Sequence, residues 1–515
     1  DNVTNKMVFK GNIDYLNENE ICIRLRATQQ NSSVLPSDSL YAIEHDAMDT
    51  TFRSMYQGLY AFMSATKERR DLLLSQREPQ FDVALDKQIA EAADDFTRIA
   101  LKAKAAKDYF LLVGPPGTGK TSCALKKMVE TFYKEEGAQI LLLSYTNRAV
   151  DEICKALSSI RPEVDFIRVG SELSCDENYR DHLIENELAT CMRRTEVCER
   201  INRCRILVGT VASISGKPEL FRLKHFDVAI VDEATQILEP QLLGILCAKG
   251  ENGKEGVGKF ILIGDHKQLP AVVLQNTEQS EVYDEALSAV GLKNLKDSLF
   301  ERLYRTARQH TDAHRTYDML CRQGRMHPEV ALFANQAFYE GRLLPVGLPH
   351  QLEDSGNINR LSFYPSRPEP MGSSAKTNHS EAKIAARLAA TVYKEHSEAF
   401  DASRTLGIIT PYRSQIALIK KEIEVLGISE LNQILIDTVE RFQGSERDVI
   451  IYSFCVNYPY QLKFLSNLTE EDGILIDRKL NVALTRARKQ MLLTGVPTLL
   501  ERNPLYKSLL KLIES

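Results

Sequence analysis

An eight-residue stretch, Gly114 to Thr121, limits the fold more than any other part of the chain. It reads G-P-P-G-T-G-K-T, follows the apolar segment Tyr109–Val113, and precedes a helical pattern. The spacing G-x-x-x-x-G-K-[ST] between a strand and a helix is typical of a loop whose backbone N–H groups surround phosphate oxygens. The positive end of the following helix also points at the phosphates. The chain is therefore expected to bind a nucleotide through its phosphates.

Continuous apolar segments recur after this loop, each followed by a polar or Gly-containing loop and usually by a helical pattern. Strands of this kind, alternating with helices, indicate a parallel α/β sheet. The segments are Ile140–Leu143, Ile206–Val208, Val228–Val231 and Phe260–Ile263, and then Leu406–Ile409, Val449–Phe454 and Met491–Thr494. Because the pattern restarts near residue 320, two α/β lobes are expected, joined by the charged segment Glu301–Arg315.

Other segments are predicted from local pattern. Residues 7–27 suggest two short strands around an Asn/Glu-rich turn. Apolar residues recur at helical spacing within residues 50–75 and 87–107. Residues 344–378 contain five prolines, at positions 345, 349, 365, 368 and 370, and are predicted to be a long loop.

The composition excludes several classes of protein. The chain has 515 residues, of which 43% are hydrophobic and 26% charged, so it is expected to fold rather than to be disordered. Its formal net charge of −5 gives no gross signature of nucleic-acid binding, although an acidic protein can hold a basic cleft. No apolar run approaches the ~20 residues that span a bilayer, and the ten cysteines show no disulfide pattern. A location in the cytoplasm, or in the nucleus of a eukaryote, is expected, with no membrane partner. Because the chain begins at Asp1 and not at Met, it is expected to be a fragment or a processed chain.

Two adjacent acidic residues end another predicted strand. Val228–Val231 is followed by Asp232 and Glu233. Ligands of open parallel sheets bind at the carboxyl ends of the strands, so both carboxylates should face the phosphate loop. Asp232 and the hydroxyl of Thr121 are predicted to hold Mg²⁺, and Glu233 to polarise a water molecule, while Lys120 neutralises phosphate charge. A second carboxylate favours a hydrolase, because a kinase must exclude water.

Short sequences in a fixed order extend this pattern over most of the chain. They are D-Y-F-L-L-V-G-P-P-G-T-G-K-T at 108–121, S-Y-T-N-R-A-V-D at 144–151, V-G-T-V-A-S at 208–213, V-D-E-A-T-Q at 231–236, G-D-H-K-Q-L-P at 264–270, Q-G-R-M-H-P at 323–328, I-T-P-Y-R-S-Q at 409–415, T-V-E-R-F-Q-G-S-E at 438–446 and L-N-V-A-L-T-R-A-R at 480–488. In this order they resemble the superfamily 1B helicases. The similarity is greatest to the branch that holds the nonsense-mediated-decay RNA helicase and the Okazaki-fragment nuclease-helicase.

The resemblance implies an α/β fold with two tandem RecA-like P-loop lobes, a partial N-terminal β-module and a helical stalk. The expected domains are a partial β-barrel-like module at 1–49, stalk helices at 50–108, a first lobe at 109–300 with a helical insertion at about 171–205, and a second lobe at 301–515. The insertion is expected to lie over the path of the nucleic acid.

The resemblance also assigns roles at the nucleotide site. The implied catalytic residues are Lys120, Asp232, Glu233, Gln268, Arg325 and Arg486. The implied nucleotide-binding residues are Gly114, Pro115, Pro116, Gly117, Thr118, Gly119, Lys120, Thr121, Ser122, Gln443 and Glu446, with Thr121 and Asp232 as the metal ligands. Gln268 resembles a γ-phosphate sensor. Arg325 and Arg486 would reach ATP from the second lobe only when the cleft is shut, so that ATP binding closes the cleft and hydrolysis reopens it.

Nucleic acid is expected to cross the top of both lobes. By resemblance the contacting residues are Thr146, Asn147, Thr210, Thr410, Pro411, Tyr412, Arg413, Thr438 and Arg441. Hydroxyl, amide and backbone groups suit contact with phosphates without reading sequence. Tyr412 is interpreted either as a stacking residue for a base or as a half-buried tyrosine of the core.

Two departures from the family pattern concern the base of the nucleotide. Relatives carry a Tyr where this chain has Gly324, and a Gln shortly before the phosphate-loop strand, where residues 90–107 contain none and Gln88 is too distant. A weakened preference for ATP over GTP follows. If ATP were required strictly, Tyr109 or Phe110 would be the alternative readers of the base.

The resulting hypothesis is an enzyme, an ATP-dependent helicase or translocase on single-stranded nucleic acid. The preferred substrate is DNA, the polarity implied by the branch is 5′→3′, and the cofactors are ATP and Mg²⁺. A nuclease domain or partner N-terminal to this fragment is a further expectation. The alternatives are an RNA helicase of the same family and an ATP-gated clamp that does not unwind. A small-molecule kinase does not explain G-D-H-K-Q-L-P or the second lobe.

Overall fold

The computed structural model describes residues 9, 11–25, 39–43, 50–251, 253–273, 275, 277–309, 312–354, 356, 358–370, 374–471 and 473–514. The chain divides into two compact units, Asp1–Thr50 and Thr51–Ser515. In the first unit, β1 (Gly11–Leu16) and β2 (Ile21–Leu25) pair as an antiparallel hairpin, which confirms the two predicted strands. Most of the other residues expected to complete a barrel-like module lie outside the described residues.

A seven-stranded sheet forms the centre of the first lobe, and the pairs between its neighbouring strands are all parallel. Its strand order is β5 (Phe166–Val169), β6 (Ile206–Thr210), β4 (Ile140–Ser144), β7 (Phe226–Val231), β8 (Val257–Gly264), β3 (Tyr109–Val113) and β9 (Tyr317–Met319). Every residue of β3, β4, β5 and β6 is buried. Continuous apolar sequence therefore marked strands that are covered on both faces.

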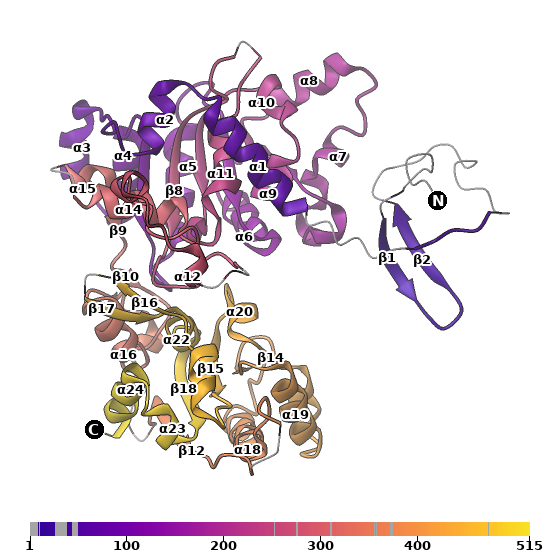
Figure 1. Cartoon of the computed structure of the whole chain (residues 1–515), viewed down its shortest axis with the longest axis vertical. Coiled ribbons are helices and arrows are strands. Elements are labelled where there is room, and N and C mark those ends of the chain that lie inside the picture. The colour runs from indigo at the N-terminus through magenta and orange to yellow at the C-terminus, as the bar shows by residue number, and fades with distance from the viewer. Residues whose placement is uncertain are drawn as a thin grey trace. The chain divides into compact units, whose positions relative to one another are not determined.

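Helices cover both faces of this sheet (Figure 1). On one face the sheet packs with α2 (Lys67–Leu73), α11 (Glu239–Leu246) and α14 (Leu299–Ala307). On the other it packs with α4 (Asp95–Ala105), α5 (Lys126–Tyr133) and α6 (Asn147–Ser158). Successive residues of a strand point to opposite faces, so Tyr109 belongs to the first core and Phe110 to the second.

A five-stranded parallel sheet forms the second lobe. Its order is β12 (Leu361–Pro365), β18 (Ala487–Gly495), β15 (Arg447–Ser453), β13 (Leu406–Ile409) and β14 (Leu435–Asp437). One core contains residues of α16 (Pro328–Phe338), α22 (Arg478–Leu484) and α24 (Pro504–Glu514). The other contains α18 (His379–Glu395) and α19 (Arg413–Glu424). Two parallel sheets, each between layers of helices, give the expected tandem α/β architecture.

The boundary between the lobes differs from the expected one at residues 300 and 301. β9 pairs with β3 of the first sheet, so this sheet takes its last strand from residues 317–319. The segment Glu301–Arg315 is not a plain connection either, because α14 is packed in the first core. Arg302 lies buried there, and its Nη2 donates to the carbonyl of Leu73 at 2.7 Å. The first lobe thus extends through Met319.

The predicted long loop at 344–378 is also wrong in part. It contains β11 (Leu344–Pro345), α17 (Pro349–Leu352) and β12, the edge strand of the second sheet. The proline at position 365 ends that strand and is tolerated there because an edge strand has one unpaired side.

The segments before β3 and within the first lobe are helical. The stalk region contains α1 (Thr50–Met63), α2, η3 (Val83–Leu85), α3 (Asp86–Ala90) and α4, and the insertion contains η5 (Glu172–Ser174), η6 (Glu177–His182), α7 (Ile184–Glu187) and α8 (Arg194–Arg203). The other elements are η4 (Lys120–Leu125), α9 (Val211–Ser215), α10 (Glu219–Leu223), η7 (Ala234–Gln236), α12 (Thr277–Ser280), α13 (Glu285–Ala289), α15 (Ala313–Thr316), β10 (Arg322–Gln323), η8 (Ser429–Gln433), α20 (Val439–Phe442), η9 (Pro459–Gln461), α21 (Leu462–Leu465), β16 (Leu468–Glu471), β17 (Ile474–Asp477) and α23 (Pro497–Leu500). Among the described residues, none of the helices has the length and apolar character needed to cross a membrane.

Gly58 lies where the first stalk helix, α1, comes close to α11, and this generates a stability prediction. A Cβ atom at Gly58 would lie 1.9 Å from the carbonyl oxygen of Pro240, a backbone atom that no rotamer change can move. Gly58→Ala should therefore lower the thermal unfolding midpoint, because overpacking costs about 1–3 kcal/mol and exceeds the ~1 kcal/mol gain in helix propensity. Gly216→Ala is the matched control, since its nearest contact would be an ordinary 3.5 Å. Equal midpoints for the two variants in calorimetry would contradict the close approach of α1 to α11.

Candidate functional site

The phosphate loop begins directly after β3. Gly117 and Gly119 adopt left-handed backbone conformations, with φ of 73° and 75°, which residues with a Cβ rarely adopt. Gly119 caps η4, a turn of π-helix in which the N–H of Ala124 donates to the carbonyl of Gly119 at 2.9 Å. The chain thus turns sharply from strand to helix and leaves a cradle of backbone N–H groups for an anion.

The two carboxylates predicted for the metal and the water lie beside this loop. The hydroxyl of Thr121 donates to Oδ2 of Asp232 at 2.5 Å, and Nζ of Lys120 lies 2.7 Å from Oε1 of Glu233. Glu233 has a φ of 54°. Left-handed backbone at a residue other than glycine costs about 1–3 kcal/mol and often occurs at functional sites. The hydroxyl and carboxylate oxygens suit Mg²⁺, which takes few protein ligands and keeps waters and substrate phosphates in its shell.

The protonation of this group follows from burial and charge. Burial raises the pKa of Asp232 to about 6, and the neighbouring Glu233 adds to the effect. Burial also opposes ionisation of Glu233, but the ammonium of Lys120 outweighs it and holds the pKa of Glu233 below its usual value. Burial likewise works against the charge of Lys120, yet the two carboxylates keep its pKa raised. Lys120 and Glu233 therefore form an ionised pair.

Gln268 follows β8 and links the two lobes. Its Nε2 donates to Asp265 at 2.7 Å, and its Oε1 accepts from Nη2 of Arg486 at 3.2 Å. Asp265 also accepts from the hydroxyl of Tyr339 at 2.7 Å. The amide therefore has a fixed orientation, with one end in the first lobe and the other on an arginine of the second.

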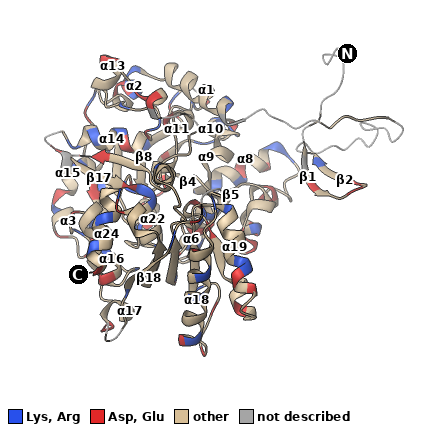
Figure 2. Ribbon diagram, turned by 60° about the horizontal axis from the view of Figure 1, so that its bottom comes forward, with Lys and Arg blue, Asp and Glu red and all other residues tan. Residues whose placement is uncertain are grey.

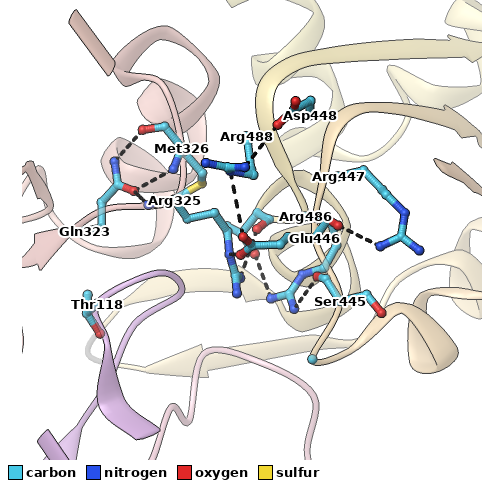
Figure 3. Close-up of polar contacts among 12 residues, drawn as sticks. Thr118, Gln323, Arg325, Met326, Ser445, Glu446, Arg447, Asp448, Arg486 and Arg488 are labelled. Carbon is cyan, nitrogen blue, oxygen red and sulfur yellow. Dashed lines mark hydrogen bonds and ion pairs between the residues drawn. The ribbon is translucent and has the colours of Figure 1, made fainter. Parts of the chain in front are cut away.

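The two predicted arginines converge on the phosphate loop from the second lobe. Figure 3 shows Arg325 and Arg486 gathered beside Glu446, with Thr118 of the loop across from them. Nε of Arg325 donates to Oε2 of Glu446 at 2.6 Å, and the side chain of Gln323 accepts the backbone N–H of Arg325 at 2.9 Å. Arg486 is 2% exposed; burial, and then the charge of Arg325, lower its pKa to about 9. It still carries its charge at neutral pH.

One cleft of about 1660 Å³ is lined by both lobes. It brings together most of the predicted nucleotide residues, namely Pro115, Pro116, Gly117, Thr118, Gly119, Lys120, Thr121, Ser122, Asp232, Glu233, Gln268, Arg325, Gln443, Glu446 and Arg486. Gly114 does not line the cleft, and its N–H donates to the carbonyl of Gly264 at 2.9 Å. Basic and acidic residues are both scattered over the helices (Figure 2), and the cleft lining includes Arg98, Arg148, Arg322, Arg441 and Arg447 in addition to Arg325 and Arg486.

Most of the predicted nucleic-acid residues do not line this cleft. Thr146 caps α6 and, like Arg441, lines the same cleft, whereas Asn147 is the first residue of α6. Thr210 caps α9 beside them, because β6 pairs with β4 in register at Ser144 and Thr210. Thr146, Asn147 and Thr210 thus lie at neighbouring carboxyl ends of the first sheet, whereas Arg441 belongs to α20 of the second lobe.

In the second lobe the corresponding residues surround the ends of β13 and β14. Thr438 precedes α20, and Pro411 and Arg413 follow β13 with Arg413 exposed. Thr410 is fully buried, which leaves its hydroxyl no surface for a phosphate. Tyr412 is half-buried, and its hydroxyl accepts from Nε2 of Gln461 at 3.2 Å, which favours the interpretation as a core tyrosine.

The base end of the cleft differs from both sequence-based alternatives. Tyr109 and Phe110 are 2% and 0% exposed within the sheet, so neither can read a base. Gln88 lies on α3 and does not line the cleft. Val346 and Leu348 do line it, and a Cβ at Gly324 would meet them at 3.3 and 3.2 Å. These two apolar residues lie in the segment predicted to be a loop, and no sequence signal marked them.

Two charged side chains of the cleft lining near α4 are already engaged. Both oxygens of Asp94 accept from Thr97, as the cap of α4, and Arg98 donates to Asp318 at 2.5 Å. The base would therefore meet the apolar surface of Val346 and Leu348, with the exposed Arg322 as a further polar side chain in the cleft lining.

Known proteins match the chain in both lobes. Family models described as AAA domains match residues 88–197 and 186–276, and residues 295–498. The DNA replication ATP-dependent helicase/nuclease DNA2 of Bos taurus is 28% identical over 94% of this chain and 46% of its own length. The protein of the same name from Homo sapiens is 28% identical over 93% of this chain and 46% of its own length. A solved Arterivirus nonstructural protein 10 (helicase) with DNA covers 81% of this chain and 65% of that chain, with a TM-score of 0.38 and 16% identity.

The matched domains and the paired lobes define a two-lobed nucleoside triphosphatase of the helicase type. The chain belongs to the superfamily 1B helicases, in the branch that includes the DNA2 helicase/nucleases. It spans just under half the length of the curated relatives described above.

The apolar base end predicts low selectivity among nucleotides. A pocket without hydrogen bonds to a base edge discriminates by about 100-fold or less, whereas a pocket built on such bonds reaches about 10⁴–10⁵. The kcat/KM for GTP should therefore lie within about 100-fold of that for ATP in steady-state hydrolysis, with Lys120→Ala as the blank. A ratio above about 10⁴ would require a hydrogen-bonding reader of the base, for which Arg322 is an exposed candidate in the cleft lining.

Proposed function

We propose that the chain is an ATP-driven motor that moves on single-stranded DNA. The observation that carries the proposal is the arrangement of Arg325 and Arg486, which the second lobe places on the same cleft as the phosphate loop of the first. Groups from both lobes would then contact one ATP molecule, so ATP occupancy and lobe position become linked.

The residues of the cleft have separate tasks in this mechanism. Lys120 exchanges its partner Glu233 for phosphate oxygens, which frees the carboxylate to orient and deprotonate the attacking water. Arg325 and Arg486 stabilise the charge that develops on the transferred phosphoryl group, a contribution that reaches about 10³–10⁵ in related enzymes. Mg²⁺, held by Thr121 and Asp232, supplies further charge neutralisation when bound. Gln268 links the phosphate site of the first lobe to Arg486 of the second.

Movement follows from the separation of the nucleic-acid residues between the lobes. Thr146, Asn147 and Thr210 belong to the first lobe, and Arg413, Thr438 and Arg441 to the second. Closure on ATP and opening after hydrolysis change the distance between these two groups of residues. If each group holds the nucleic acid in turn, the nucleic acid advances one step in each cycle. The 5′→3′ polarity is carried over from the family branch.

DNA is preferred to RNA because the relatives described above carry DNA replication in their names. Those names also include a nuclease; a longer protein containing this chain would join the motor to such a domain. Its compartment would be that of its DNA, the cytoplasm of a bacterium or the nucleus of a eukaryote. The second candidate, an RNA helicase of the same family, follows from backbone contacts that do not distinguish the sugars.

Glu233→Gln tests the hydrolytic mechanism. The amide cannot accept the proton of water, so kcat should fall at least about 100-fold, as for other groups that act directly on the transition state. Binding of a fluorescent ATP analogue should persist, because Lys120 and the glycine loop are intact. Turnover near that of the parent protein would rule out Glu233 as the base.

The substrate is tested by ATP hydrolysis alone, with single-stranded DNA and with single-stranded RNA of the same length. We expect DNA to raise kcat at least tenfold and RNA to raise it less, because bound strand favours the closed cleft that aligns the arginines. Equal or greater stimulation by RNA would support the second candidate. No stimulation by either would contradict the motor and favour an ATP-gated clamp.

A further inference from the structure

Arg148 is one of the side chains that cross the cleft. It lies in the first turn of α6, directly after Thr146 and Asn147. Its Nη1 donates to Oγ of Ser445 at 2.8 Å, and its Nη2 donates to the carbonyl of Gly444 at 3.4 Å. These acceptors belong to the second lobe, in the turn between α20 and β15. The guanidinium of Arg148 in the first lobe therefore donates two hydrogen bonds to one turn of the second lobe.

The same turn holds both arginines of the nucleotide site. The carbonyl of Ser445 accepts from Nη1 of Arg486 at 3.4 Å, and the next residue, Glu446, accepts from Arg325. Figure 3 shows Ser445 and Glu446 in direct contact with these arginines. Ser445 is 2% exposed, and its N–H donates to the carbonyl of Phe442 at 2.8 Å, so the turn is tight. A shift of Ser445 would therefore move the groups that hold Arg325 and Arg486.

The contact is also sensitive to charge. Burial lowers the pKa of the neighbouring Arg447, and the positive charge of Arg148 lowers it further, so the two guanidinium groups repel one another. Among the described residues, Nε of Arg447 has no hydrogen-bond partner. A phosphate of a nucleic-acid backbone near Thr146 would screen this repulsion and favour the bridged state.

We propose that Arg148 is a positioning residue that transmits occupancy of the nucleic-acid site at the start of α6 to the turn Gly444–Glu446, and so aligns Arg325 and Arg486. The inference rests on the proposed function, because it explains how bound strand would stimulate hydrolysis. The bound nucleic acid would contact the first turn of α6, where Arg148 lies. Arg148 contacts Ser445, and the turn that contains Ser445 contacts Arg325 and Arg486.

Arg148→Ala is the principal test, with Lys155→Ala as the matched control. Lys155 lies on the same helix and lines the same cleft, but the described residues include no hydrogen-bond or ion-pair partner for it. The measured quantity is the ratio of ATP turnover with single-stranded DNA to turnover without it. Arg148→Ala should lower this ratio roughly tenfold, the size expected for loss of a hydrogen bond from a charged donor. Lys155→Ala should keep the parent ratio.

An equilibrium measurement separates positioning from simple structural damage. Linkage requires that a non-hydrolysable ATP analogue change the affinity for single-stranded DNA by the same factor as DNA changes the affinity for the analogue. That factor should fall toward one in Arg148→Ala. Arg148→Lys should give an intermediate factor, because an ammonium lacks the planar fork that reaches both acceptors. Ser445→Ala should reduce the factor, and the double variant should be no worse than the worse single one.

The outcomes are distinct. If the parent protein is stimulated by DNA and Arg148→Ala matches Lys155→Ala, the inference fails and the proposed function stands. If Arg148→Ala lowers turnover with and without DNA equally and leaves the linkage factor unchanged, Arg148 does not transmit occupancy, and the inference also fails. If nucleic acid does not stimulate ATP turnover of the parent protein, the proposed function fails, and the inference fails because it rests on that function.

Discussion

The site depends on the parallel pairing of β3 with β8 and of β8 with β7. Val113 stands opposite Gly264, and Val231 stands opposite Leu262, so three loops that are distant in sequence leave the sheet at the same edge. Parallel strands necessarily place their carboxyl ends together, and here those ends supply the phosphate loop, the carboxylate pair and Gln268. A register shift of one residue in any of these strands would turn its core side chains to the opposite face and move the catalytic groups with them.

Charge balance is the second constraint on the cleft. Arg486 is 2% exposed and the side chains of Lys120 and Arg325 are each 16% exposed. Each is held by a group that a phosphate can replace: Glu233 for Lys120, Glu446 for Arg325 and the oxygen of Gln268 for Arg486. Buried charges are tolerated only when they are paired. The cleft is therefore formed with internal partners, and ATP would replace two ion pairs and one hydrogen bond to a neutral amide with contacts to its phosphates.

The sequence predicted the central strands of both sheets more accurately than the boundaries of the two lobes. Continuous apolar strands and the glycine-lysine loop are local signals, and the segments predicted as strands from Tyr109 onward all form strands. β5 was not predicted because its apolar run is short and contains an arginine. This residue, Arg168, is buried and pairs with Asp151 at 2.8 Å. α14 resembled a linker because charged residues such as Arg302 are buried through specific partners, and sequence alone does not distinguish a buried charge from a solvated one. In the site, Lys120 and Arg486 follow from their motifs, whereas the contact of Arg148 with Ser445, 297 residues away, depends on how the lobes meet.

The way the lobes meet is itself suited to a motor. The cores of the first lobe draw on its own sheet and helices, and the cores of the second do likewise, with Leu269 among the few first-lobe residues packed into the second. The contacts between the lobes are largely polar, such as the hydrogen bond from the N–H of Gly324 to the carbonyl of Gly117 at 2.8 Å and the pair of Arg478 with Glu301 at 2.5 Å. Water can replace a hydrogen bond at a net cost of about 1 kcal/mol, whereas exposing a core side chain costs about 1.5–3 kcal/mol without replacement. Opening the cleft would therefore leave both folds intact, as the proposed motor requires.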